Sequence, residues 1–321
     1  MKKDEILYIV VPCYNEEEVI SETNKRLVAK LKEMIKSKKI SNQSRIMFVN
    51  DGSRDKTWSL IEEFHKKNKM VTGVNLSRNR GHQNALLSGL MTAKKYADIV
   101  ISMDADLQDD INAVDEMVDR YYEGNDIVYG VRSSRKKDTF FKKFTAEGFY
   151  KIMKFMGVDI VFNHADYRLT SKRVLNELEN YKEVNLFLRG LFPLIGFKST
   201  VVYYERAERF AGESKYPLKK MISFAWEGIT SFTVTPLKMI MNLGLGIAFL
   251  SFLFLIYVVI GHFIGNNVSG WTTIIVLLCF FSGVQIFCIG IIGEYLGKVY
   301  IESKERPRYC IEKVLSDSNN E

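Results

Sequence analysis

Two long stretches near the carboxyl end of the chain contain no charged side chain, and they limit the possible folds more than any other feature. The first runs from Met239 to Ile260 and the second from Trp271 to Gly293. Each is longer than the roughly 20 apolar residues that a helix needs to cross a bilayer. A buried helix of a soluble protein is the alternative, but two such runs in succession are unusual in a soluble chain. The sequence therefore predicts two transmembrane helices, over residues 239–261 and 271–294.

The charges beside these stretches predict where the rest of the chain lies. The loop between the stretches contains neither lysine nor arginine, whereas basic residues flank the pair: Lys219, Lys220 and Lys238 before it, and Lys298, Lys304, Arg306 and Arg308 after it. Because basic flanks stay in the cytoplasm, we expect a multi-pass protein of the cell membrane. Its large amino-terminal domain (residues 1–215) and its tail (295–321) would both be cytoplasmic. The net charge of +7 suits a domain at anionic headgroups; nucleic acid is the other partner it could indicate, but the predicted spans argue against it.

Upstream of the predicted spans, strand-like and helix-like segments alternate. Short apolar runs typical of buried strands occur at residues 6–12, 45–53, 70–77, 98–106 and 126–132. Segments with helical periodicity stand between them, at residues 16–36, 56–67, 82–96 and 111–124. This alternation predicts an open, mostly parallel α/β sheet.

Polar clusters follow the predicted strands at the points where those strands end. They comprise residues 12–16, 50–55, 77–82, 104–109 and Arg132. In open parallel sheets, ligands bind just beyond the carboxyl ends of the strands. Since all of the clusters belong to that one edge, the sequence predicts a single binding site there.

The acidic cluster "DADLQDD" indicates what this site binds. The chain has neither the glycine-rich dinucleotide fingerprint nor the P-loop motif, so a nucleotide would be held by side chains and a metal. Asp104 and Asp106 supply the oxygen ligands that Mg²⁺ or Mn²⁺ prefers, and such an ion would bridge diphosphate oxygens. The alternative is an acidic turn that caps the helix beginning near Ile111. That alternative suits Asp109 and Asp110 better than the first two aspartates.

Taken in order, the motifs resemble those of a known enzyme family. They are "VPCYNEEE", "VNDGSRDKT", "LSRNRGHQNAL", "MDADLQDD", "DYRLTSKRV", "LRGL" and "ERFAGESKYPLKKM", followed by two spans. The chain resembles the membrane-anchored family-2 glycosyltransferases, in particular the polyprenyl-phosphate group that includes dolichol-phosphate mannose synthase and bactoprenol glycosyltransferases. The resemblance implies a GT-A, Rossmann-like domain. It also implies inverting, metal-dependent transfer of a hexose-type sugar, from UDP-glucose or UDP-N-acetylglucosamine, to a polyprenyl phosphate such as undecaprenyl phosphate. The product would be a lipid-linked sugar donor for cell-envelope glycosylation.

The resemblance also implies roles for particular positions. It places the nucleotide-sugar pocket at Pro12, Tyr14, Asn15, Glu16, Asp51, Ser77, Asp104, Ala105 and Asp106. It places the metal at Asp104, Asp106 and Gln108, and the acceptor phosphate at Arg132, Arg206, Arg209, Ser214 and Lys215. The catalytic group that it implies is Asp104, Asp106, Asp166, Arg206 and Lys215. Many bacterial relatives have lysine where this chain has His82, so for His82 a structural role at the start of a helix stays open.

Asp166 matches an acidic position that the family is often thought to use as a catalytic base. A phosphate monoester has a second pKa of about 6, so a polyprenyl phosphate is largely ionised at neutral pH and needs little proton removal. We therefore predict that Asp166 positions the acceptor or orients Arg168, with base catalysis as the alternative.

Two further segments suit a site at a membrane surface. The basic loop "ERAERFAGESKY" could be a solvated turn, but its cations and Gly212 suit a loop that closes over two phosphate-bearing ligands. Residues 216–238 mix Trp226 and Phe232 with lysines, a pattern typical of an interfacial amphipathic segment.

Two other functions and one assembly question stay open. A processive polysaccharide synthase of the same superfamily would carry a Q-x-x-R-W motif and more spans, where this chain has "LFLRGLF" and two. A catalytically idle membrane scaffold would not require the paired aspartates. Small residues in the spans, as in "NLGLG", are typical of packed membrane helices, which leaves a homo-oligomer open.

Overall fold

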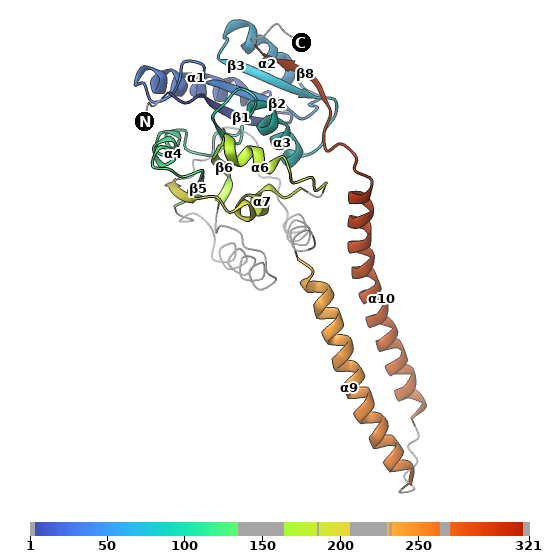
Figure 1. Ribbon diagram of the computed structural model, residues 1–321. Helices are drawn as coiled ribbons and strands as arrows, with labels where there is room; N and C mark the ends of the chain where they lie inside the picture. The colour runs from blue at the N-terminus through green and yellow to red at the C-terminus, as the bar shows by residue number, and fades with distance from the viewer. Residues whose placement is uncertain are drawn as a thin grey trace. The chain divides into compact units, whose positions relative to one another are not determined.

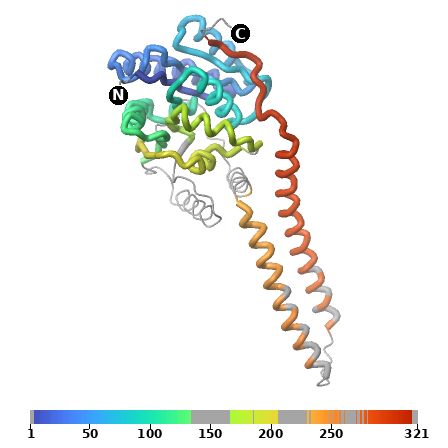
Figure 2. The backbone as a smooth tube through the Cα atoms, viewed as in Figure 1, coloured from blue at the N-terminus to red at the C-terminus, as the bar shows by residue number. Residues whose placement is uncertain are grey.

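A computed structural model describes residues 4–133, 164–184, 186–205, 230, 233–263 and 270–316. They fall into two compact units. An α/β unit contains the described residues up to 205 together with 306–316, and a helical unit contains those from 230 to 305. Figure 1 shows both units, and Figure 2 traces the same backbone as a tube.

The α/β unit is built on one mixed, mostly parallel sheet with the strand order β7-β5-β6-β4-β1-β2-β3-β8. Its strands are β1 (Leu7–Cys13), β2 (Arg45–Asn50), β3 (Val71–Leu76), β4 (Ile99–Ser102), β5 (Ile127–Arg132), β6 (His164–Ser171), β7 (Ser199–Tyr204) and β8 (Ile311–Leu315). Strands β1 to β4 pair in parallel, and β7 is parallel to β5. Strand β6 is antiparallel to both β4 and β5, and β8 is antiparallel to β3.

Helices cover both faces of this sheet. They are α1 (Ile20–Lys36), α2 (Thr57–Lys67), α3 (His82–Ala93), α4 (Ala113–Tyr122), α6 (Lys172–Leu178) and α7 (Leu188–Ile195). Apolar residues of α1, α2 and α4 share one core with alternate residues of β1 and β2, while α3 packs on the opposite face, where Gly89 lies against Val10 and Val49. Burial on both faces explains why the central strands are continuous apolar runs rather than alternating ones.

Strand β8 is an element that the sequence analysis did not predict. It belongs to the tail that follows both apolar helices, yet it pairs with β3 at the edge of the sheet (Figure 1). Its attachment includes a bond from the Ser77 N–H to the Cys310 carbonyl (3.0 Å) and an ion pair between Lys313 and Glu62 (2.7 Å). The chain therefore ends in the same sheet in which it begins.

The helical unit contains α9 (Thr235–Phe263) and α10 (Trp271–Ser303). Within them, Thr235–Phe254 and Phe280–Ser303 are long and apolar enough to cross a membrane, and almost none of their residues is buried. Phe249 and Phe287, for example, are more than half exposed. The predicted spans over 239–261 and 271–294 lie within these helices. Exposure of so many large apolar side chains argues against a soluble core helix.

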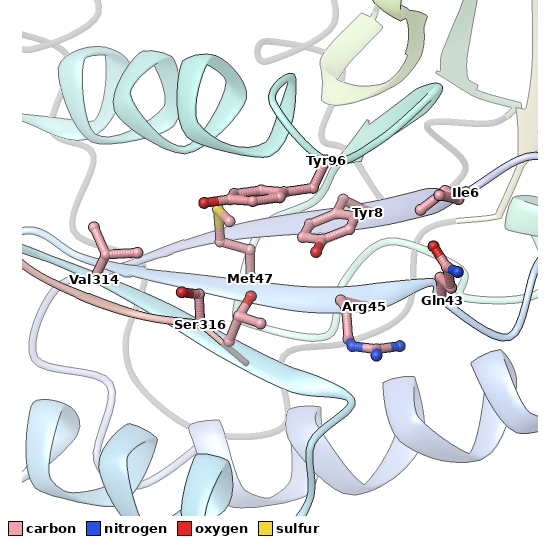
Figure 3. A pocket seen from close by; sticks show the side chains of 9 residues that line it. Ile6, Tyr8, Gln43, Arg45, Met47, Tyr96, Val314 and Ser316 are labelled. Carbon is pink, nitrogen blue, oxygen red and sulfur yellow. The ribbon is translucent and has the colours of Figure 1, made fainter. Parts of the chain in front are cut away.

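The sheet has a small cavity at the amino ends of its strands (Figure 3). Its volume is about 250 Å³, and Tyr8, Arg45 and Thr72 line it at the beginnings of β1, β2 and β3. The rings of Tyr8 and Tyr96 stack there with centroids 6.2 Å apart. No carboxylate is among the described residues that line this cavity, and none of them belongs to the predicted acidic site.

Candidate active site

A second cavity, of about 420 Å³, lies at the carboxyl ends of the strands. Its lining residues are Pro12, Cys13, Tyr14, Glu16, Asp51, Asn79, Gly81, His82, Ala85, Asp104, Ala105, Asp106, Asp166 and Arg189. They come from the ends of β1, β2, β3 and β4 and from β6 and α7. The structure therefore brings together at one edge most of the positions that were predicted for the donor.

Several predicted positions lie elsewhere. Asn15, Ser77 and Gln108 do not line the cavity, although each is within two residues of a lining residue. Arg132 does not line it either and is remote from the lining residues in sequence, but it contacts Asp109 of the acidic loop. Arg206, Arg209, Ser214 and Lys215, and most of the interfacial segment 216–238, lie outside the described residues. Their predicted roles stay predictions.

Several hydrogen bonds fix the loop after β1 to the loop after β2 and to the start of α2. Asn15 has a positive φ of 53° and donates its N–H to the Ser53 hydroxyl (3.0 Å), while its side-chain oxygen accepts the Arg54 N–H (2.9 Å). The Glu16 N–H donates to the Thr57 hydroxyl (2.9 Å). Asn15 thus holds the two loops together beside the cavity, and the neighbouring Tyr14 side chain is left exposed at its rim.

Asp51 fixes the loop that follows β3. Its carboxylate accepts the Arg80 N–H (2.7 Å) and the Gly81 N–H (2.9 Å), and the residue is only 3% exposed. Burial raises the pKa of Asp51, although these two bonds and the charge of His82 oppose the rise. The Asp51 carboxylate therefore holds the loop after β3 through these N–H groups, and it also lines the cavity.

Gly52 permits the close approach of these loops. Its φ is +63°, and a Cβ built there would lie 2.5 Å from the Asn79 backbone nitrogen. We expect Gly52→Ala to destabilise the domain by more than the roughly 1–2 kcal/mol of left-handed strain alone, and to raise the donor KM because the 77–81 loop must shift. Gly124→Ala is the matched control: its φ is +91°, but no neighbour lies closer than 4.0 Å. Denaturant unfolding and donor KM measure both effects; equal losses in the two variants would contradict this prediction.

The acidic loop after β4 is held in an unusual conformation. Leu107, between the second aspartate and Gln108, has a left-handed φ of 57°, which is strained for a residue with a Cβ. The Ala105 carbonyl accepts the Thr23 hydroxyl (2.8 Å), and the Asp106 carboxylate accepts the Gln108 N–H (3.2 Å). These contacts stabilise the strained conformation of the loop. In this conformation Asp104 and Asp106 both line one cavity.

The chemistry of this loop fits a hard divalent cation. Burial raises the pKa of Asp104, and the charges of Asp166 and Asp106 add to the rise while His82 and Arg189 oppose it. Carboxylates that repel one another in this way would gain from a cation. Within the described ranges no group of three His, Cys, Asp or Glu side chains could bind a metal by itself. Mg²⁺ and Mn²⁺ bind through one or two carboxylates and complete their shell with water and substrate phosphates.

The other two aspartates of the loop behave differently from each other. The Asp110 side chain accepts the N–H of Asn112 (2.9 Å), the residue that precedes α4, and no side chain among the described residues caps that helix in the way the capping alternative predicted. Asp109 is buried and accepts the Tyr204 hydroxyl (2.5 Å). Burial and the charge of Asp104 raise the pKa of Asp109 to about 6, against the opposing effects of Tyr204 and Arg132.

Arg132 belongs to this same buried cluster. Its Nη2 atom lies 3.6 Å from the Asp109 carboxylate, and its Nε–H donates to the Tyr204 hydroxyl (3.3 Å). A second tyrosine, Tyr167, donates its hydroxyl to the Asp110 carbonyl (2.9 Å). Strands β5, β6 and β7 thereby clamp the acidic loop through these side chains. The predicted role of Arg132 at the acceptor phosphate stays a prediction.

Asp166 lies on β6 between two arginines. Arg168 Nη2 lies 2.7 Å from one carboxylate oxygen, and Arg189 binds both oxygens, through Nη2 (3.0 Å) and Nε (3.2 Å). Burial alone would raise the pKa of Asp166, but Arg189, a hydrogen bond from His82 and Arg168 hold it well below its usual range. Asp166 is therefore an ionised, fully engaged carboxylate, and it contacts Arg168 as predicted.

His82 lies at the start of a helix, the position that the sequence analysis left open for it, and its side chain also lines the cavity. It is the first residue of α3, and its Nε2 atom lies 3.4 Å from the Asp166 carboxylate and 3.7 Å from that of Asp104. The imidazole therefore stands between the acidic pair and β6, inside the cavity. Arg189 is the cavity cation that residue patterns missed: "LRGL" was noted as a motif, but nothing in its spacing places it opposite Asp166.

Comparison with known proteins decides the family. Residues 8–179 match glycosyl transferase family 2, and residues 235–299 match the GtrB C-terminal hairpin. The chain belongs to glycosyl transferase family 2. This family-2 domain covers β1 to α6 and so includes both aspartates of the acidic pair, and the chain is a glycosyltransferase with a GT-A α/β domain followed by two apolar helices.

Individual family-2 relatives cover nearly the whole chain. It is 52% identical over 307 residues to the uncharacterized glycosyltransferase YkoT of Bacillus subtilis, covering 96% of this chain and 91% of that protein. It is 39% identical over 305 residues to the bactoprenol glucosyl transferase of Shigella phage SfV, covering 94% and 97%. Among solved structures, mannosyl-3-phosphoglycerate synthase from Rubrobacter xylanophilus overlaps with a TM-score of 0.47 at 13% identity, over 70% of this chain and 71% of that one.

Proposed function

We propose that this glycosyltransferase moves a hexose-type sugar from a nucleotide diphosphate, UDP-glucose or UDP-N-acetylglucosamine, to a polyprenyl phosphate such as undecaprenyl phosphate. The observation that supports this most is the composition of the acidic cavity: Asp104 and Asp106 face it together with the ion-paired Asp166 and Arg189. A relative named bactoprenol glucosyl transferase aligns with 94% of this chain, which itself matches the family-2 domain and the GtrB C-terminal hairpin. The product would serve as a lipid-linked sugar donor in the cell envelope.

The reaction is a single in-line displacement with inversion at the anomeric carbon. An oxygen of the acceptor phosphate attacks that carbon, the bond from the carbon to the diphosphate oxygen breaks, and the nucleoside diphosphate leaves with the electron pair. Because the acceptor phosphate is largely ionised at neutral pH, no strong base is needed. Asp166, whose carboxylate is held by two arginines, serves to position groups.

Asp104 and Asp106, with Gln108 beside them, would hold Mg²⁺ or Mn²⁺, which when bound stabilises negative charge on the diphosphate. The residues fit this role by their oxygen chemistry and by their mutual repulsion. Around them, Pro12, Tyr14, Glu16 and Ala105 line the space for the nucleotide and sugar. Arg206, Arg209, Ser214 and Lys215 are proposed to close over the two phosphates, together with Arg132.

The acceptor explains why such an enzyme would be a membrane protein. A polyprenyl tail stays in the bilayer, so the soluble donor must come to the lipid. Helices α9 and α10 are proposed as the two spans. Strand β8 follows both helices and pairs with β3, so the segments before and after the helices must lie on the same side of the membrane, which requires an even number of crossings. The basic residues that flank the two helices support a cytoplasmic location for that side. A homo-oligomer is compatible with this arrangement.

The direct test is an assay of the purified full-length protein with undecaprenyl phosphate, Mg²⁺ or Mn²⁺, and a panel of nucleotide sugars. We expect one hexosyl unit per lipid phosphate, identified by mass, and no product from undecaprenol, which lacks the phosphate. A polymer would indicate a processive synthase instead. Absence of product and of nucleotide-sugar binding across the panel would favour a scaffold.

A further inference from the structure

Arg189 is a cation of the acidic cavity to which the proposed function has so far given no role toward substrate. It is the second residue of α7, whose first N–H, from Leu188, donates to the Gln83 side chain of α3 (3.0 Å). The start of α7 is thereby bound to the start of α3, where His82 lies. From this position the guanidinium binds both oxygens of Asp166 and lines the same cavity as Asp104 and Asp106.

The two arginines that contact Asp166 differ in what they can reach. Arg168 is 1% exposed, stacks on the Phe192 ring at 4.3 Å, and serves as a buried counter-charge. The Arg189 side chain is 30% exposed and lines the cavity. Asp166 is thus paired with Arg168 in the interior and with Arg189 on the cavity side, and Arg189 is the one of the two arginines that a ligand in the cavity can reach.

A guanidinium that lines the cavity and is held by a carboxylate suits a phosphate group. Arginine presents several N–H donors in a rigid planar fork, so a group anchored along one edge by a carboxylate is pre-oriented toward an oxyanion. Such pre-organised donors are effective where negative charge gathers in a reaction. A structural ion pair alone would not require a second arginine at the cavity surface.

We propose that Arg189 binds a phosphate oxygen of a substrate in the acidic cavity, and that Asp166 acts through Arg189 as a positioning residue. The inference rests on the proposed function, since the phosphate belongs either to the leaving nucleoside diphosphate or to the lipid acceptor. Both are oxyanions that one guanidinium can bind. The donor diphosphate and the lipid phosphate are distinguished by measuring whether Arg189 affects nucleotide binding when the lipid acceptor is absent.

The test compares Arg189→Gln and Arg189→Lys in the full-length protein. We expect Arg189→Gln to lower kcat/KM about a hundredfold, with partial recovery in Arg189→Lys, because lysine restores the charge but not the planar fork. Arg173→Gln is the matched control: it removes a surface arginine that is paired with Asp126 and 63% exposed, and should change kcat/KM by less than about twofold. Wild-type kinetics in Arg189→Gln would overturn the proposal, as would equal losses in the glutamine and lysine variants.

Calorimetry with UDP and Mn²⁺, without lipid, identifies the phosphate. Weaker UDP binding in Arg189→Gln assigns the contact to the donor diphosphate. Unchanged UDP binding with a raised acceptor KM assigns it to the lipid phosphate. If neither UDP binding nor the acceptor KM changes, the proposed role of Arg189 is wrong. Sugar transfer by the wild-type protein would still support the proposed function in that case.

The link to Asp166 has its own readout. If Asp166 acts through Arg189, the double variant Asp166→Asn/Arg189→Gln should be no slower than Arg189→Gln alone, because the two residues work as a unit. Multiplied losses would overturn the positioning role. Should the double variant fold poorly, the calorimetric comparison of the single Arg189 variants still decides whether a phosphate is bound.

Discussion

Replacement of Asp104 and Asp106 together by asparagine will reduce sugar transfer at least about a thousandfold, because the loss of metal-bound charge stabilisation costs several kcal/mol and each 1.4 kcal/mol is tenfold in rate. Both carboxylates face one cavity, and burial and mutual repulsion raise the pKa of the first. Asparagine keeps the shape and removes the charge. Initial rates with a saturating nucleotide sugar and lipid acceptor measure the effect.

A neighbouring aspartate gives the matched control. Asp110 is in the same loop, but its carboxylate accepts the Asn112 N–H, a bond that an amide oxygen can also accept. Asp110→Asn should therefore keep its rate within about twofold. Titration with Mn²⁺, followed by its paramagnetic effect on water relaxation, gives a readout independent of turnover: binding should be lost in the double variant and kept in Asp110→Asn. Undiminished turnover in the double variant would remove the basis of the proposed site.

The fold could be predicted largely because its central strands are strongly apolar. Ile9, Val10 and Val11 are all fully buried, and a run of this kind between helical segments is typical of a parallel sheet covered on both faces. The prediction of a family-2 glycosyltransferase domain with a mostly parallel α/β sheet, followed by two apolar helices, is confirmed. An apolar run of this kind predicts a buried strand from its own residues, without information on the contacts made by the rest of the chain.

Strand β6 was missed for a physical reason. Its sequence, "HADYRLTS", includes Asp166 and Arg168, which a residue pattern assigns to a loop. Both side chains are buried in the sheet because each neutralises the other. Strand β8 was missed because it is a five-residue edge strand with two charged residues, and its partner β3 lies more than 200 residues away in the sequence.

Those site residues that directly follow a strand could be predicted from the sequence. The aspartates after β4 and the residues after β1 reach the same cavity because parallel strands end at one edge. The contacts of Asp109 with Tyr204 and of Asp166 with Arg189 depend on side-chain packing between elements remote in sequence. No local pattern encodes such pairs.

Asp166→Asn is expected to lower the rate of transfer about a hundredfold, as a misplaced substrate-binding group does, without altering the pH dependence. Its pKa is held well below the usual range, so the carboxylate contributes stability above its unfolded pKa of about 4 and loses it only as the pH falls through the lower folded value. Asparagine is preferred to alanine, which would leave Arg168 buried without a partner at a cost of about 3–5 kcal/mol.

The pH series separates positioning from base catalysis because the acceptor itself titrates with a pKa of about 6. Above that value the phosphate is a dianion and needs no base; below it, the protonated acceptor would gain from one. Asp166 stays ionised on both sides. A positioning residue therefore predicts a constant ratio of wild-type to Asp166→Asn rates from about pH 5 to about pH 8. A ratio that grows steadily as the pH falls below the acceptor pKa would instead identify Asp166 as the group that removes the proton.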